Sequence, residues 1–249
     1  MSTQMLNDRT FDAEQRAKLA TERAGAMSYG GVIVKTLAFL VVLLIAASWG
    51  WQNADRYFSP TSGLLFFAGY IVLMALTFAA VANPRIAAGA GFFYALLMGA
   101  WMGAISSVYE SFYEGIVGQA VFTSLCVFVA CLFLYGFRIV KVTNKFAAMV
   151  IGATVGIALL YFVAWIFSIF GVGFQLWNNP TPLGIGLSIA IALAAALNLF
   201  LDFAVIERGV DSGAPKEYEW YCAYGLLSTL VWLYVEILRV LALLRRASS

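Results

Sequence analysis

Long stretches without a charged residue dominate this sequence. Between Lys145 and Asp202 lie 56 consecutive uncharged residues, most of them apolar. A helix needs about 20 predominantly apolar residues to cross a bilayer, so this interval has room for two crossings. Charged residues make up only 11% of the 249 residues, against roughly 25% in soluble domains. The sequence therefore predicts an all-α integral membrane protein.

The intervals between consecutive charges predict seven spans. The long interval is divided by Gly171-Val172-Gly173 and by Asn178-Asn179-Pro180-Thr181-Pro182, because glycine and proline interrupt helices. The predicted spans lie between Lys35 and Asp55, at about 63–82, 90–109 and 117–137, twice between Lys145 and Asp202, and at about 222–244. This gives a polar tail at 1–31, a seven-helix bundle at 32–244 and a short C-terminal tail at 245–249.

The distribution of basic residues predicts the orientation. With seven spans, 11 Lys and Arg side chains fall on the N-terminal side and four on the other side. Loops rich in Lys and Arg stay in the cytoplasm. We therefore expect a cytoplasmic N-terminus, in a multi-pass protein of the cell (inner or plasma) membrane. The first apolar run begins too late for a cleavable signal peptide and is long enough to act as an uncleaved anchor.

Several chemistries are excluded by what the chain lacks. It has no histidine, which removes His-based nucleophile activation and His-ligated metals. Its three cysteines form no CxxC pair, and a net charge of +2 does not indicate nucleic-acid binding. The predicted last span has no lysine for a retinal Schiff base. We expect neither an enzyme nor a resident cofactor.

Small residues recur at helical spacing in two of the predicted spans. Gly99 and Gly103 lie four residues apart in the third span, and Gly152 and Gly156 in the fifth. Such pairs allow two helix backbones to approach closely. Both stripes are predicted to be helix contacts.

Two acidic residues lie inside predicted spans, Asp202 near the end of the sixth and Glu236 in the seventh. An ionised carboxylate at depth costs at least ~2.5–3.5 kcal/mol, so such a group is retained when it is paired or useful. In one interpretation Asp202 lies at the membrane surface, and Arg239, one turn from Glu236, neutralises that acid. In the other, the two carboxyls meet, share a proton and act as a pH-sensitive latch that offers a weak, transient calcium site.

The register of the last two helices decides between these interpretations. If both helices are continuous and antiparallel, the two acids are offset by about 11 residues, or ~16 Å. The offset shrinks if residues 216–224 form a separate interfacial helix.

Around these acids the sequence resembles the Bax inhibitor family, which includes the transmembrane Bax-inhibitor-motif proteins and their bacterial YccA-like relatives. The resemblance covers roughly residues 27–244. It is carried by Asn198-Leu199-Phe200-Leu201-Asp202-Phe203, Leu233-Tyr234-Val235-Glu236-Ile237-Leu238, Met27 to Thr36, and the third span with Gly99, Gly103 and Glu110.

The resemblance implies a seven-helix bundle with the last helix near its centre. It also implies a pH-dependent calcium leak governed by a carboxylate pair, which would be Asp202 and Glu236 here. An arginine from the second-span region should lie nearby, and Arg85 is the candidate by position, with Arg239 as the other counter-charge. The bacterial branch is associated with modulating a membrane protease. The alternative is therefore a non-conducting regulator that binds such a partner, or a stress-response partner, through its tail and loops.

Overall fold

The computed structural model describes residues 25–57, 60–170 and 179–248. Over these residues the chain is helical, and its only β pairing is an isolated bridge between Ala26 and Pro215. The all-α prediction is confirmed. In chain order the helices are α2 (Tyr29–Gln52), α3 (Ala54–Tyr57), α4 (Pro60–Ala82), the 3-10 turn η1 (Pro84–Ile86), α5 (Ala87–Phe112), α6 (Ile116–Gly136), α7 (Asn144–Ile169), α8 (Pro182–Asp211) and α9 (Tyr218–Ser248).

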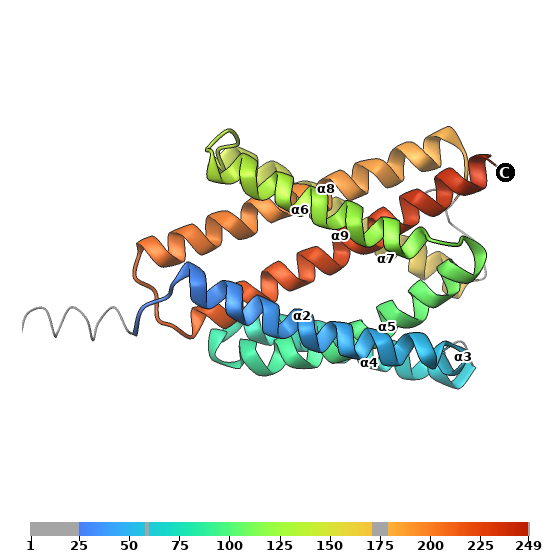
Figure 1. Cartoon of the computed structure of the whole chain (residues 1–249), viewed down its shortest axis with the longest axis horizontal. Helices are drawn as coiled ribbons and strands as arrows, with labels where there is room; N and C mark the ends of the chain where they lie inside the picture. The colour runs from blue at the N-terminus through green and yellow to red at the C-terminus, as the bar shows by residue number, and fades with distance from the viewer. Residues whose placement is uncertain (1–24, 58–59, 171–178, 249) are drawn as a thin grey trace, which may run out of the picture.

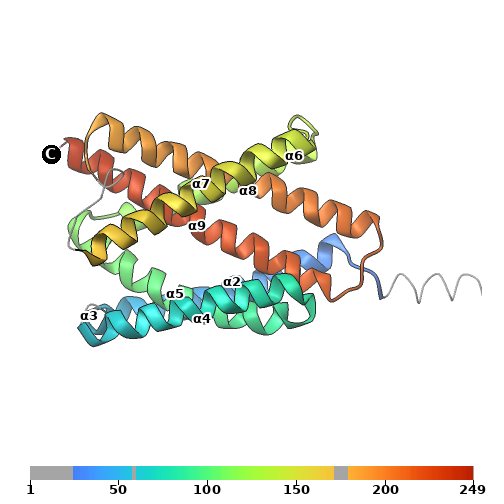
Figure 2. The same cartoon turned by 180° about the vertical axis from the view of Figure 1, so that it is seen from behind.

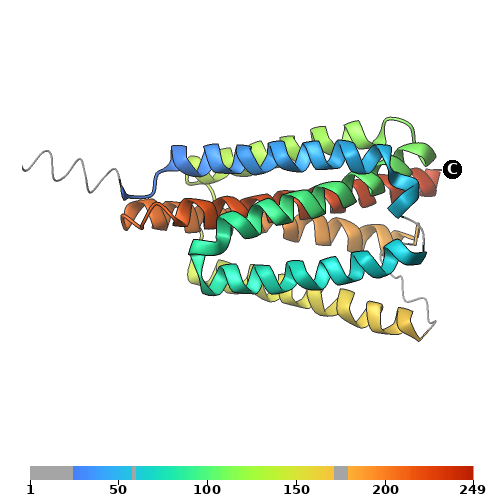
Figure 3. The ribbon, with the colours of Figure 1, turned by 90° about the horizontal axis from the view of Figure 1, so that it is seen from below.

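The long helices form a bundle along one common direction (Figure 1). The beginning of α2 and the α8–α9 turn lie at one end, and the C-terminus lies at the other (Figures 1 and 3). Seen from behind, α4 and α7 lie in front of the other helices (Figure 2). In the described residues α4 packs mainly on α5, and α7 mainly on α8, so both helices are peripheral.

Helix α9 occupies the interior of the bundle. It packs against α2, α5, α6 and α8. The most apolar 18-residue stretch of α9 is 56% buried inside the protein, whereas the corresponding stretch of α7 is 6% buried. The polar and charged side chains of α9 therefore lie where contacts with other helices decide what they do.

Six helices of the described part are long and apolar enough to cross a membrane. They are α2, α5 together with η1, α6, α7, α8 and α9. Helix α4 has 23 residues, and of these the stretch Ile71–Ala80 is found to be an apolar helix over the described side chains. The structure thus supports a multi-pass membrane protein with six candidate spans over the described residues. The seventh predicted span, at about 63–82, corresponds to α4 and stays a prediction.

Two helix starts differ from, or refine, the predicted boundaries. Helix α2 begins at Tyr29, inside the predicted tail, because the Ser28 side chain accepts a hydrogen bond from the Gly31 amide and caps the helix. Residues 1–24 of that tail lie outside the described residues. Thr181 caps α8 in the same way, with Pro182 at the first helical position. The predicted break at Gly171–Gly173 and Asn178 also lies outside the described residues.

The two glycine stripes have different outcomes. A Cβ at Gly99 would lie 2.4 Å from the Leu43 carbonyl oxygen, and one at Gly103 would lie 1.9 Å from that of Ala47. The α2–α5 approach therefore requires glycine, and this predicted contact is confirmed. At Gly152 and Gly156 a Cβ would meet nothing within 4 Å. The second stripe lies on the open face of α7, so the contact predicted for it is wrong within the described residues.

Candidate functional site

Asp202 lies in the interior of the bundle with one unpartnered oxygen. Its Oδ2 atom is buried and has no hydrogen-bond partner among the described residues. A Cβ built on Gly225 of α9 would lie 3.6 Å from Oδ1. Cys222 and the Thr229 hydroxyl lie beside the same carboxyl. Residues 222, 225 and 229 share one face of a helix, so Asp202 faces a single stripe of α9 made of small side chains.

That environment offers Asp202 no cationic partner. In the described ranges no lysine or arginine forms an ion pair or hydrogen bond with it. Buried charged groups are normally paired, because leaving one unpaired costs several kcal/mol, roughly. The Oδ2 atom of Asp202 therefore has neither solvent nor a cation as its partner, which is unusual for a buried acid.

Glu236 is fully paired. Its side chain is 1% exposed and lies 2.7 Å from the Arg239 guanidinium, through Oε2. Tyr161 of α7 donates a hydrogen bond to Oε1 at 2.9 Å, and the Trp232 indole donates to the same oxygen at 3.2 Å. Arg239 also donates to the Tyr161 hydroxyl at 2.6 Å and lies against its ring. Four side chains thus form a closed polar cluster between α9 and α7, and the predicted pairing with Arg239 is observed.

The structure does not bring Asp202 and Glu236 together. Helix α9 is continuous from Tyr218, so residues 216–224 do not form a separate helix. Asp202 lies at the level of Gly225 and Thr229, and Glu236 lies seven residues, or about 10 Å, beyond Thr229. Within that interval, Trp232 packs against Ile191 of α8, 11 residues before Asp202. The continuous antiparallel register therefore separates the two acids by two to three helical turns.

Arg85 lies outside this region. Its guanidinium is 3.3 Å from the Glu217 carboxylate, and both side chains are mostly exposed, at 79% and 59%. Arg85 lies in η1, and its partner Glu217 directly precedes α9. Asp202 faces Gly225, about two turns into α9. Of the two candidate counter-charges, only Arg239 contacts one of the predicted acids.

A third buried acid, Glu219, was not identified from the sequence. The Glu219 side chain is fully buried and forms an ion pair with Lys35 of α2. Its Oε1 atom also accepts hydrogen bonds from the Ser28 amide, at 2.9 Å, and from the Ser28 hydroxyl, at 3.0 Å. A Cβ at Gly31 would lie 2.1 Å from that oxygen, so glycine leaves the space that the carboxylate occupies. The one sequence signal was Lys35, a charge at the edge of an apolar run.

Backbone hydrogen bonds near this ion pair hold the residues before α2 against the α8–α9 turn. The Met27 amide donates to the Ala214 carbonyl oxygen at 2.7 Å, and the Lys216 amide donates to that of Gly25 at 3.0 Å. Together with the Glu219 ion pair, they attach the start of α2 to the start of α9.

No cluster of metal ligands occurs in the part of the chain that the structure describes. No three His, Cys, Asp or Glu side chains there lie close enough to hold a metal ion. Asp202 and Glu236 are too far apart to be ligands of one ion in this arrangement.

Comparison with known proteins supports the resemblance noted above. Among curated proteins no match to the chain was found. The family model described as Bax inhibitor 1 like matches residues 4–246, which is nearly the whole chain. The match includes α8 with Asp202 and α9 with Glu236. The chain belongs to the Bax inhibitor 1 like family.

Proposed function

We propose that this protein is a pH-sensitive cation leak in the cell membrane, with Asp202 as the group on the ion path. The observation that carries the proposal is the unpartnered, buried Oδ2 of Asp202 inside a membrane-type bundle. A carboxyl in such a place either keeps its proton or takes a cation as its counter-charge, since an isolated ionised carboxylate at depth is costly.

The neighbours of Asp202 favour a site that opens to a cation. Gly225 leaves space beside Oδ1, and the Thr229 hydroxyl supplies another oxygen. The titratable groups of α9 on this side, Tyr221 and Cys222, carry no positive charge that would repel a cation. Calcium prefers six to eight oxygen ligands, so roughly two or three oxygens would hold it only weakly and transiently. Weak binding suits passage rather than storage.

Glu236 takes a different part in this proposal from the one predicted. Because Arg239 neutralises it, Glu236 is a second gating carboxylate only in a state in which Arg239 has moved away from it. In the closed state Arg239 is its counter-charge, and the cluster with Tyr161 keeps α7 on α9. Arg85, on the surface beside Glu217, has no part in the gate.

We further propose that α4 crosses the membrane in addition to the six candidate spans, which makes seven crossings. We also propose a cytoplasmic N-terminus and no catalytic role. Helix α4 has 23 residues and begins and ends without a charge. The loops at the N-terminal end of the bundle hold most of the basic residues, which supports the orientation.

Calcium entry into proteoliposomes tests the proposal. The protein is reconstituted with a trapped calcium dye, and flux is measured across about pH 6 to 8 for the wild type, Asp202→Asn and Glu236→Gln. We expect flux that varies with pH in the wild type and loses that variation in Asp202→Asn. Asp211→Asn is the matched control, because Asp211 is an exposed acid at the end of the same helix.

Two results would contradict the proposal. One is absence of flux at every pH, and the other is an Asp202→Asn protein that conducts with the pH dependence of the wild type. The first result would favour the non-conducting alternative, a regulator of a membrane protease or stress-response partner as in the bacterial branch.

A further inference from the structure

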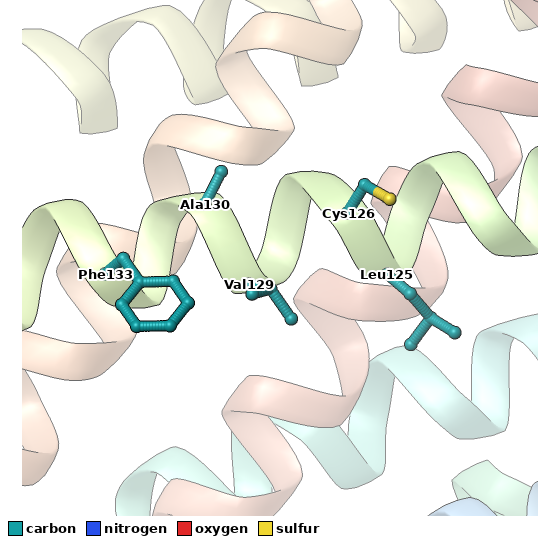
Figure 4. Close-up of a pocket in the computed structure, with 5 residues that line it drawn as sticks. All are labelled: Leu125, Cys126, Val129, Ala130 and Phe133. Carbon is teal, nitrogen blue, oxygen red and sulfur yellow. The ribbon is translucent and has the colours of Figure 1, made fainter.

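The outer face of α6 carries an apolar depression. Leu125, Val129 and Phe133 form one row along the helix, and the smaller Cys126 and Ala130 lie beside it (Figure 4). The hollow has a volume of about 420 Å³. Since large side chains border small ones, the surface has a groove rather than the even cover of apolar side chains expected of a lipid-facing helix.

The row of larger side chains continues to the end of α6. Phe137 follows Phe133 by four residues, and the two rings stack with their centroids 6.0 Å apart. From Leu125 to Phe137 the helix rises about 18 Å. One leaflet of the hydrocarbon core is about 15 Å deep, half of the ~30 Å total. The hollow borders the part of this row from Leu125 to Phe133, and the whole apolar row to Phe137 has about the length of one acyl chain in one leaflet.

A basic loop directly follows α6. Residues 137–145 contain Arg138, Lys141 and Lys145 and no acid. All three side chains are exposed. Arg138 lies 3.5 Å from Glu207, whereas Lys141 and Lys145 form no ion pair with any described residue. Two cations without an ion-pair partner among the described residues thus follow the end of the apolar row.

We propose that α6 and the α6–α7 loop form a binding site for one anionic phospholipid of the cytoplasmic leaflet. An acyl chain lies in the groove beside Cys126 and Ala130, and the phosphate-bearing headgroup lies against Lys141 and Lys145. The two features match the two halves of one molecule: apolar surface over the depth of a leaflet, then positive charge at its edge. Basic side chains next to a membrane span attract anionic headgroups.

Native mass spectrometry of the full-length protein released from nanodiscs tests this site. The nanodiscs contain phosphatidylcholine alone or mixed with phosphatidylglycerol. We expect phosphatidylglycerol to be retained in preference to phosphatidylcholine by the wild type. In the double variant Lys141→Gln/Lys145→Gln, retention should weaken about 25-fold, since each lysine near an anionic surface contributes a factor of roughly five. Ala130→Leu, which fills the groove, should reduce retention of either lipid.

Matched variants separate a site from general attraction. Lys216→Gln removes an exposed charge at the same end of the bundle, and Ala153→Leu enlarges an exposed side chain on α7. Both should retain phosphatidylglycerol like the wild type. Equal loss in Lys216→Gln, or unchanged retention in the Lys141/Lys145 double variant, would overturn the proposal. If soluble glycerol phosphate displaces the retained lipid, the site recognises a free phosphate group and the acyl-chain part is wrong.

Discussion

The free-energy cost of burying the Glu236 carboxylate depends on Arg239. The Glu236 side chain is 1% exposed, and its nearest cation is the Arg239 guanidinium at 2.7 Å. Removing one partner of a buried ion pair leaves an uncompensated charge and costs about 3–5 kcal/mol, whereas replacing both partners with apolar or neutral groups is often nearly neutral. The pair therefore predicts a strong dependence of each residue on the other.

We expect Arg239→Met to lower the free energy of unfolding by about 3–5 kcal/mol. The double variant Arg239→Met/Glu236→Gln should recover most of that loss, because no charge then remains buried. Unfolding in detergent, followed by circular dichroism, gives both values and the coupling between the two sites. A double variant as unstable as the sum of the two single variants would show that the pair is not coupled.

Sequence reasoning identified this pair but not the Glu219–Lys35 pair, for a physical reason. Residues three apart in a helix are neighbours wherever the helix lies, so Arg239 could be placed beside Glu236 without a structure. Glu219 and Lys35 are 184 residues apart, and only the packing of α2 on α9 brings them together. The separation of Asp202 from Glu236 also needed the structure, because it depends on α9 continuing without a break from Tyr218.

At the scale of helices, α2 and α5 depend on backbone approach. A Cβ at Gly103 would lie 1.9 Å from the Ala47 carbonyl oxygen, and backbone atoms cannot move aside as a flexible side chain can. Gly152 of α7 is a matched position, helical and with open space around it. The two glycines differ in surroundings and not in backbone conformation.

We expect opposite outcomes from the same substitution at these glycines. Gly103→Ala should destabilise the protein by about 1–3 kcal/mol, because the α2–α5 contact must open. Gly152→Ala should be neutral or stabilise by up to about 1 kcal/mol, since alanine favours helix more than glycine does. Thermal unfolding of the two variants in the same detergent measures the difference. Equal melting temperatures would mean that α2 and α5 separate without cost.

The intervals between charged residues predicted some helix ends correctly and others wrongly. They located α6 to within one residue at each end, because that helix ends where the polar loops begin. They placed the start of α2 too late, since Lys35 was treated as a boundary although its buried partner Glu219 lets the helix extend past it. They also ended α8 near Asp202, whereas the helix continues to Asp211. A charge marks a helix end only when it is solvated.

At the scale of the whole molecule, the number of crossings fixes which loops share a side. Seven crossings put Asp55 of α3 on the opposite side from Arg85 and Lys141. If α4 does not cross, Asp55 and Arg85 lie on one side. Lys141 lies on the side of Arg85 in either case, because α5 and α6 together return the chain to it. Three positions therefore distinguish the two topologies.

We expect single cysteines at these positions to be labelled differently in intact cells. The native Cys126, Cys131 and Cys222 are first replaced by alanine, and Asp55→Cys, Arg85→Cys or Lys141→Cys is then introduced at an exposed site. A membrane-impermeant maleimide added from outside should label only Asp55→Cys, and all three should react after the membrane is opened with detergent. In the proposed orientation Arg85 and Lys141 lie in basic loops on the cytoplasmic side, where the reagent does not reach them. Labelling of all three from outside would mean that α4 does not cross, and labelling of Arg85→Cys and Lys141→Cys alone would mean that the orientation is reversed.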